Sequence, residues 1–182
     1  METIHLTSNT LQDFTAEVRQ ATGEDVVRCY QCGNCTAGCP YTEFFDYPVS
    51  QIMRMIQTGQ REKALSSRAI WLCATCETCT TRCPCEIDVA EVMDGLRNIA
   101  YREKRFTEKD IRTFYEAFLA SLRNHGRVFE LEIIARYNLK SGHLLTDADL
   151  GPKVMKQLHF LPKRIKGRDE IARIFKKFVE KK

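Results

Sequence analysis

Residues 29–40 have the sequence Cys29-Tyr30-Gln31-Cys32-Gly33-Asn34-Cys35-Thr36-Ala37-Gly38-Cys39-Pro40. The same cysteine spacing returns 44 residues further along, as Cys73-x2-Cys76-x2-Cys79-x3-Cys83-Pro84. We call the four cysteines of each repeat the first run and the second run. Two such runs in register, each ending in Cys-Pro, are typical of metal ligation rather than of a disulfide framework.

The spacing within each run suits a cubane 4Fe-4S cluster. Three cysteines separated by two residues wrap the backbone around three irons, and the cysteine before proline points away and ligates the other cluster in two-cluster ferredoxins. The sequence therefore predicts two interlocked 4Fe-4S clusters. Their ligands are expected to be Cys29, Cys32, Cys35 and Cys83 for the first cluster, and Cys73, Cys76, Cys79 and Cys39 for the second.

Two other uses of cysteine are less well matched. Disulfides do not suit nine cysteines in a chain without a secretory signal. Structural zinc prefers separated Cys-x2-Cys pairs, often with histidine, and the four histidines lie outside both runs. Cys85 belongs to neither group of four and is either a small buried hydrophobe or a spare, redox-sensitive thiol.

The composition excludes several classes of protein. A chain of 182 residues with 43% hydrophobic and 29% charged residues is expected to fold as an ordinary globular protein. It has no apolar run long enough to span a membrane, and the absence of a secretory signal predicts a cytoplasmic location. There is no glycine-rich phosphate loop, no adjacent Cys-Cys pair and no acid–base constellation, so we expect an electron carrier without a catalytic site of its own.

Apolar residues recur at steps of three and four along most of the chain, which predicts an all-α fold. Helices are expected at residues 10–22, 49–58, 64–72, 89–100, 107–122, 128–137 and 169–179, with a loop at 141–152. Pro48 and Asp88 are helix-start signals, and Gly23 and Gly59 are stop signals.

The expected organisation is an α-helical ferredoxin-like domain at 1–125 and a helical extension at 126–182. From Lys153 onward, eleven Lys or Arg residues face three acidic residues, so the extension is strongly basic. No nucleic-acid motif accompanies this charge, and a docking surface for acidic protein partners is the favoured interpretation. The alternative is that these helices complete the core around the clusters.

The cysteine runs also resemble a known family. The segment 30–40, together with Trp71-Leu72-Cys73 and Arg82-Cys83-Pro84, resembles the family of heterodisulfide reductase C subunits, which have helical ferredoxin domains. The similarity is specific from about residue 28 to residue 101.

The resemblance implies membership of a cytoplasmic complex of methanogenesis. In that complex the flavoprotein (the A subunit) carries out flavin-based electron bifurcation, the C subunit relays electrons, and the catalytic B subunit reduces the mixed disulfide of coenzyme M and coenzyme B. Hydrogenase or formate dehydrogenase would feed the flavoprotein. The alternatives are an iron-sulfur subunit of the fumarate reductase, glycolate oxidase or glycerol-3-phosphate dehydrogenase type, or a freestanding ferredoxin-like carrier.

Overall fold

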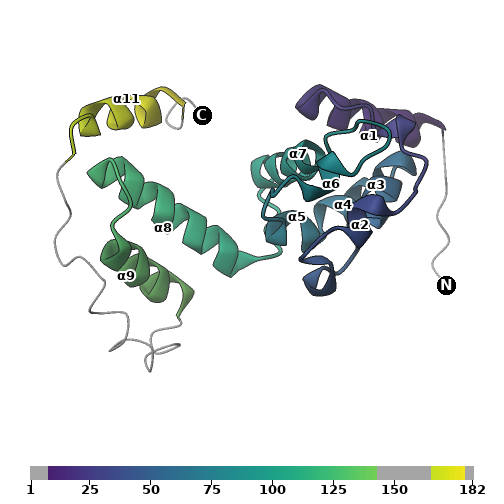
Figure 1. Ribbon diagram of the computed structural model, residues 1–182. Coiled ribbons are helices and arrows are strands. Elements are labelled where there is room, and N and C mark those ends of the chain that lie inside the picture. The colour runs from purple at the N-terminus through teal and green to yellow at the C-terminus, as the bar shows by residue number, and fades with distance from the viewer. Residues whose placement is uncertain (1–7, 143–164, 179–182) are drawn as a thin grey trace. The chain divides into compact units, whose positions relative to one another are not determined.

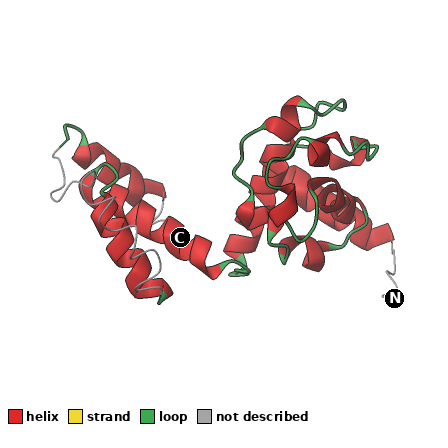
Figure 2. Ribbon diagram, turned by 60° about the horizontal axis from the view of Figure 1, so that its bottom comes forward, coloured by secondary structure: helices red, strands yellow, loops and turns green. Residues whose placement is uncertain are grey.

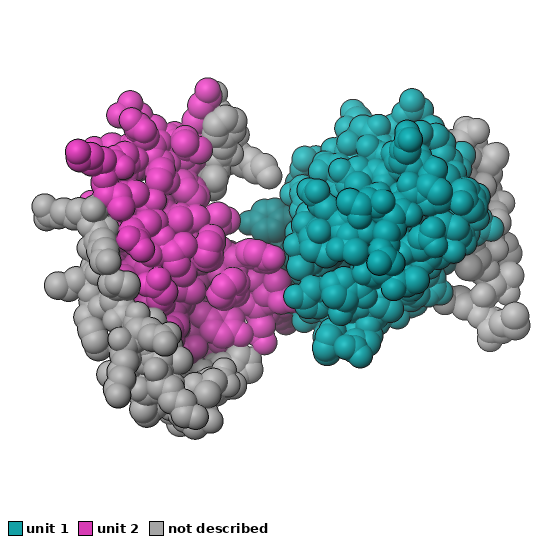
Figure 3. All heavy atoms as spheres, in the orientation of Figure 1, with its two compact units in different colours: residues 1–108 teal, residues 109–182 magenta. Residues whose placement is uncertain are grey.

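A computed structural model describes residues 8–142 and 165–178 of the chain (Figure 1). In these two ranges every regular element is a helix and no strand occurs, which Figure 2 shows by its colours. The predicted all-α fold class is confirmed. The chain divides into two compact units, which comprise residues 1–108 and residues 109–182 (Figure 3).

Unit 1 contains both cysteine runs and consists of α-helices joined by short loops and 3-10 turns, the latter labelled η. Its elements are α1 (Ser8–Thr22), η1 (Val26–Arg28), α2 (Asn34–Ala37), η2 (Thr42–Phe44), α3 (Val49–Gln57), α4 (Arg61–Leu65), α5 (Ala69–Leu72), α6 (Thr78–Thr81) and α7 (Val89–Arg102).

The three long helices of unit 1 enclose its core. α1 contacts both α3 and α7, and α7 also contacts α4, α5 and α6. Gly95 permits the close approach of α7 to α1, because a Cβ atom at this position would lie 2.1 Å from Cγ2 of Thr22. The buried side chains between these helices include Phe14, Val18, Ile52, Ile56, Met93 and Leu96. α3 and α7 thus form a rigid base for the cysteine runs.

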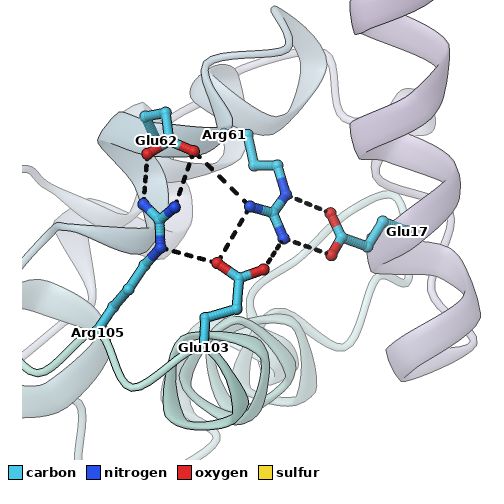
Figure 4. Close-up of polar contacts among 5 residues, drawn as sticks. All are labelled: Glu17, Arg61, Glu62, Glu103 and Arg105. Carbon is cyan, nitrogen blue, oxygen red and sulfur yellow. Dashed lines mark hydrogen bonds and ion pairs between the residues drawn. The ribbon is translucent and has the colours of Figure 1, made fainter.

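A network of charged side chains ties α1, α4 and the end of α7 together (Figure 4). The guanidinium of Arg61 donates two hydrogen bonds of 2.7 Å to Glu17 and also pairs with Glu103. Arg105 pairs with Glu62 and lies 2.8 Å from Glu103. Hydrogen bonds to Glu17 and Glu103 raise the pKa of Arg61. Because these groups are partly exposed, we expect the network to contribute only about 1 kcal/mol.

Unit 2 consists of α8 (Lys109–His125), α9 (Glu130–Ser141) and α11 (Arg168–Phe178). α8 contacts both α9 and α11. At the turn between α8 and α9, the hydroxyl of Ser121 accepts the backbone N–H of Phe129 at 2.9 Å. Glu132 accepts a hydrogen bond of 2.9 Å from Asn124 and lies 2.8 Å from Nε2 of His125.

The boundary between the units differs from the predicted one. The sequence placed the division after residue 125, whereas the structure divides the chain after Glu108. The difference arises because α8 packs against α9 and α11, which makes it part of the second unit. The predicted loop at 141–152 lies outside the described residues except for its first two positions. Among the described helices, none is both long enough and apolar enough to cross a bilayer.

Candidate metal centres

Each cysteine run turns around its second cysteine through two residues in the left-handed region. In the first run these residues are Gln31 and Gly33, with φ values of 64° and 80°. The equivalent residues of the second run, Thr75 and Glu77, have φ values of 50° and 61°. Successive backbone N–H groups in such conformations form a concave nest, a geometry that binds anions and iron-sulfur clusters.

The third cysteine of each run lies on a short helix, Cys35 on α2 and Cys79 on α6. Both are buried, whereas the second cysteines, Cys32 and Cys76, are exposed. Burial raises the pKa of Cys35 and raises that of Cys79 to about 11. Without a bound metal these two thiols therefore keep their protons at neutral pH. Metal binding has to displace these protons.

Four cysteines from the two runs line one pocket. Cys39, the last cysteine of the first run, lies there with Cys73, Cys76 and Cys79 of the second run. The remaining lining is mostly apolar and aromatic and comes from Tyr41, Phe45, Val49, Ala74, Thr75, Thr78, Ala90 and Met93. This is the set of cysteines predicted for the second cluster. The ligation itself remains a prediction.

Three of the other four predicted ligands, Cys29, Cys32 and Cys35, lie near one another. The thiols of Cys29 and Cys32 are close enough to Cys35 to affect its pKa, although burial has the largest effect. Tyr30 has a raised pKa because of desolvation and because the thiols of Cys32, Cys85 and Cys83 lie near its phenol. Cys83 of the second run is thus near enough to Tyr30 of the first run to affect its pKa.

The helix after each run is attached to it by a threonine. The hydroxyl of Thr36 accepts the backbone N–H of Ser50 in the first turn of α3, at 2.9 Å. The hydroxyl of Thr80 accepts the backbone N–H of Ala90 in the first turn of α7, at 3.1 Å. Thr36 and Thr80 are 44 residues apart, as are the cysteines, while Ser50 and Ala90 are 40 residues apart. The repeat therefore includes the helices as well as the runs.

A side chain further along each of these helices anchors the backbone of the first cysteine. The amide of Gln57 in α3 donates to the carbonyl oxygen of Cys29 at 2.7 Å and to that of Val26 at 3.1 Å. In α7, Arg97 donates to the carbonyl oxygen of Cys73 at 2.7 Å and to that of Ile70 at 2.8 Å.

These anchoring residues were not predicted. A signal was present, because Val49, Ile52, Met53 and Ile56 correspond in apolar character to Val89, Val92, Met93 and Leu96, each 40 residues later. The cysteines repeat at a shift of 44 residues, and this different shift hides the helical part of the repeat. The two anchors also differ in residue type, so no sequence match connects Gln57 with Arg97.

The loop after the first run supports the start of the second run. Asp46 accepts hydrogen bonds from the hydroxyl of Ser67 at 2.7 Å and from the backbone N–H groups of Arg68 and Ala69 at 2.9 and 3.0 Å. Burial opposes ionisation of this carboxyl, but the hydrogen bonds outweigh it and hold the pKa of Asp46 below its usual range. Asp46 thereby fixes the start of α5, the helix that directly precedes Cys73.

Cys85 does not line the pocket described above, and its neighbours suggest a different use. Its Sγ donates to the carbonyl oxygen of Arg28 at 3.1 Å. The bond joins the residues after the second run to the residue that precedes the first run. Cys85 is only partly buried, so it is not the fully buried small hydrophobe that was one of its two expected uses. Its use as a spare ligand or redox thiol stays a prediction.

The site can hold the predicted cofactors. It supplies eight thiols in two neighbouring groups, two backbone nests and, for the second group, a largely apolar pocket. Residues 25–87 match a family model described as a 4Fe-4S dicluster domain. This match confirms the predicted cofactors, two 4Fe-4S clusters.

Individual proteins that are similar to the chain give more specific information than the family model. It is 34% identical over 99 residues to the C subunit of the H(2):CoB-CoM heterodisulfide,ferredoxin reductase of Methanothermobacter thermautotrophicus, a match that covers 54% of each chain. It is 39% identical over 97 residues to the iron-sulfur C 2 subunit of the CoB--CoM heterodisulfide reductase of Methanocaldococcus jannaschii, covering 49% of this chain and 52% of the relative.

A third relative extends the similarity. The C2 subunit of the H(2)/formate:CoB-CoM heterodisulfide,ferredoxin reductase of Methanococcus maripaludis is 30% identical over 130 residues, covering 71% of this chain and 59% of the relative. The predicted resemblance to the C subunits of heterodisulfide reductases is thus confirmed. The chain spans about half the length of the first two of these relatives.

Proposed function

We propose that this chain is the electron-relay subunit of a heterodisulfide reductase complex. It would receive electrons from an A-type flavoprotein and deliver them to a B-type catalytic partner that reduces the mixed disulfide of coenzyme M and coenzyme B. The location would be cytoplasmic. The observation that carries the proposal is the pairing of two cysteine runs within one unit, with relatives named as C subunits.

The clusters supply reversible one-electron transfer when bound. The residues of the chain hold them and control access to them. Cys35 and Cys79 are buried, so the inner side of each site is closed to water. Cys32 and Cys76 are exposed. A redox partner would therefore come close to each centre at its second cysteine.

The second unit suits partner docking, the role expected for residues 126–182. Large apolar side chains are exposed on its helices, namely Phe114, Tyr115, Leu119, Ile134, Leu139 and Ile174. No cysteine lies beyond Cys85, so unit 2 contributes no thiolate ligand. Basic residues beside exposed apolar side chains suit an acidic partner, because charge steers the encounter and apolar contacts supply the burial.

Two measurements on the full-length chain test the proposal. Anaerobic purification followed by metal analysis should give about eight irons with matching acid-labile sulfide, whereas about two zincs would exclude an electron carrier. Purification of the tagged chain from its source should recover a flavoprotein and a second cysteine-rich subunit. Recovery of the cluster-loaded chain alone would favour a freestanding carrier, and recovery with a different oxidoreductase would redirect the assignment.

A further inference from the structure

The two halves of unit 1 differ in the charge of the residue that anchors the first cysteine of each run. Gln57 and Arg97 are equivalent, because each follows the first residue of its helix by eight positions and binds the carbonyl oxygen of a first cysteine at 2.7 Å. The first anchor is a neutral amide and the second is a guanidinium, which is always positively charged.

The two helices also differ at the position three residues before the anchor, where their side chains have opposite charge. Asp94 lies 3.0 Å from Nη1 of Arg97, and its equivalent in α3, Arg54, donates to Oε1 of Gln57 at 3.3 Å. The side chain of Arg97 is only 16% exposed, whereas Arg54 is exposed to solvent. Water and salt therefore screen Arg54 far more than they screen Arg97.

The orientation of the Arg97–Asp94 pair determines which charge dominates at the second run. Nη2 of Arg97 binds the carbonyl oxygen of Cys73, while Asp94 binds the other terminal nitrogen. The positive member of the pair is thus in direct contact with the backbone of a predicted ligand.

We propose that Arg97 makes the two clusters electrically unequal, so that an electron entering the protein resides preferentially on the cluster at Cys73, Cys76, Cys79 and Cys39. This proposal rests on the proposed relay function. A reduced cluster carries one more negative charge than an oxidised one, and a nearby buried cation stabilises the reduced form. Hydrogen bonding, net charge and solvent exposure are the means by which proteins set such potentials. Arg97 is a positioning and tuning residue in this account and does not bind the cluster.

The test is a redox titration of the full-length, cluster-loaded chain under anaerobic conditions, followed by electron paramagnetic resonance. Arg97→Gln places in α7 the same neutral amide that Gln57 provides in α3. We expect the higher of the two midpoint potentials to fall, with at least a tenfold change in the distribution of one electron between the clusters, which corresponds to about 59 mV; a fall of the lower midpoint alone would contradict the proposal. Arg97→Lys should retain most of the wild-type value. Arg102→Gln removes an exposed charge from the same helix and should change neither midpoint.

An Arg97→Gln protein that keeps about eight irons and both wild-type midpoints would overturn the proposal. If that variant loses a cluster, Asp94→Asn decides the question. This substitution retains the guanidinium and removes its counter-charge, so the higher midpoint should rise; an unchanged higher midpoint would again overturn the proposal. Failure of the proposed relay function would be seen in the wild-type chain, before any variant is compared. That chain would lack two clusters or would have no redox partners.

Discussion

The carboxylate of Asp46 accepts the backbone N–H of Ala69 at 3.0 Å, across 23 residues of sequence. Asp46 lies between the first run and α3, and Ala69 begins the helix that leads to Cys73. The loop that follows the first run thus fixes the helix that precedes the second run. Damage at this contact is therefore expected to affect the second run, although Asp46 follows the first.

Replacement of Asp46 tests this connection. Asp46→Ala removes the acceptor for three backbone N–H groups, those of Tyr47, Arg68 and Ala69, and loss of such a cap costs about 1 kcal/mol. We expect the loaded protein to release its clusters about five times faster in moderate guanidinium chloride, measured by the decay of visible absorbance. Glu43→Gln is the control, because Glu43 is an exposed carboxylate in the same connector. Equal release rates in the two variants would argue against a role for the Asp46 cap.

If the last cysteine of each run ligates the cluster of the other run, Cys39→Ser should give an unusual result. Cys39 belongs to the first run by sequence but lines the pocket of Cys73, Cys76 and Cys79. The variant should perturb the spectrum of the second cluster and spare the first, and Cys83→Ser should do the reverse. Mössbauer or electron paramagnetic resonance spectra of the two variants would resolve this. Damage confined to the cluster of the same run would show that the ligands are not crossed.

Cys85→Ser should leave both clusters in place. Eight other cysteines are available as ligands, and a serine hydroxyl can still donate to the carbonyl oxygen of Arg28. We expect about eight irons per chain and unchanged redox behaviour. A fall toward about four irons would show that Cys85 ligates a cluster.

Partner binding should depend on apolar side chains that unit 2 exposes on its surface. Leu119 and Leu139 are 48% and 76% exposed. The double variant Leu119→Ser and Leu139→Ser should keep both clusters and recover at least tenfold less partner protein in a pull-down, because interfaces depend on a few buried apolar anchors. Ala135→Ser, a small exposed position on α9, is the matched control. Full recovery by the double variant would exclude this surface.

The long helices of unit 1 were predictable because their ends have strong local signals. Pro48 precedes α3, and the side chain of Asp88 caps α7 by accepting the N–H of Glu91 at 2.9 Å. Gly23 adopts a left-handed conformation directly after α1, as its role as a stop signal requires. The cysteine spacing likewise predicted two clusters, because their ligands are chemically specific.

The remaining features depend on contacts between distant residues. Nothing local marks Gln57 or Arg97 as a partner of a cysteine carbonyl, since both are ordinary polar residues within a helix. The position of α8 was missed for a similar reason. Its apolar periodicity suits packing against either unit, and only its contacts with α9 and α11 decide the matter.

The left-handed backbone of the cysteine runs gives the chain a way to respond to iron supply. Gln31, Thr75 and Glu77 adopt a conformation that costs a non-glycine residue about 1–2 kcal/mol, and cluster binding offsets this cost. Within the two cysteine runs, the second run carries two of the three strained residues, so a newly made chain that finds no iron should open around residues 75–77 before it opens in the first run. Limited proteolysis of metal-free protein should cut there before it cuts in the first run, and Glu77→Gly should slow the cut. In an iron-starved cell, unloaded copies would then be degraded before they could occupy a place in a complex that they cannot serve.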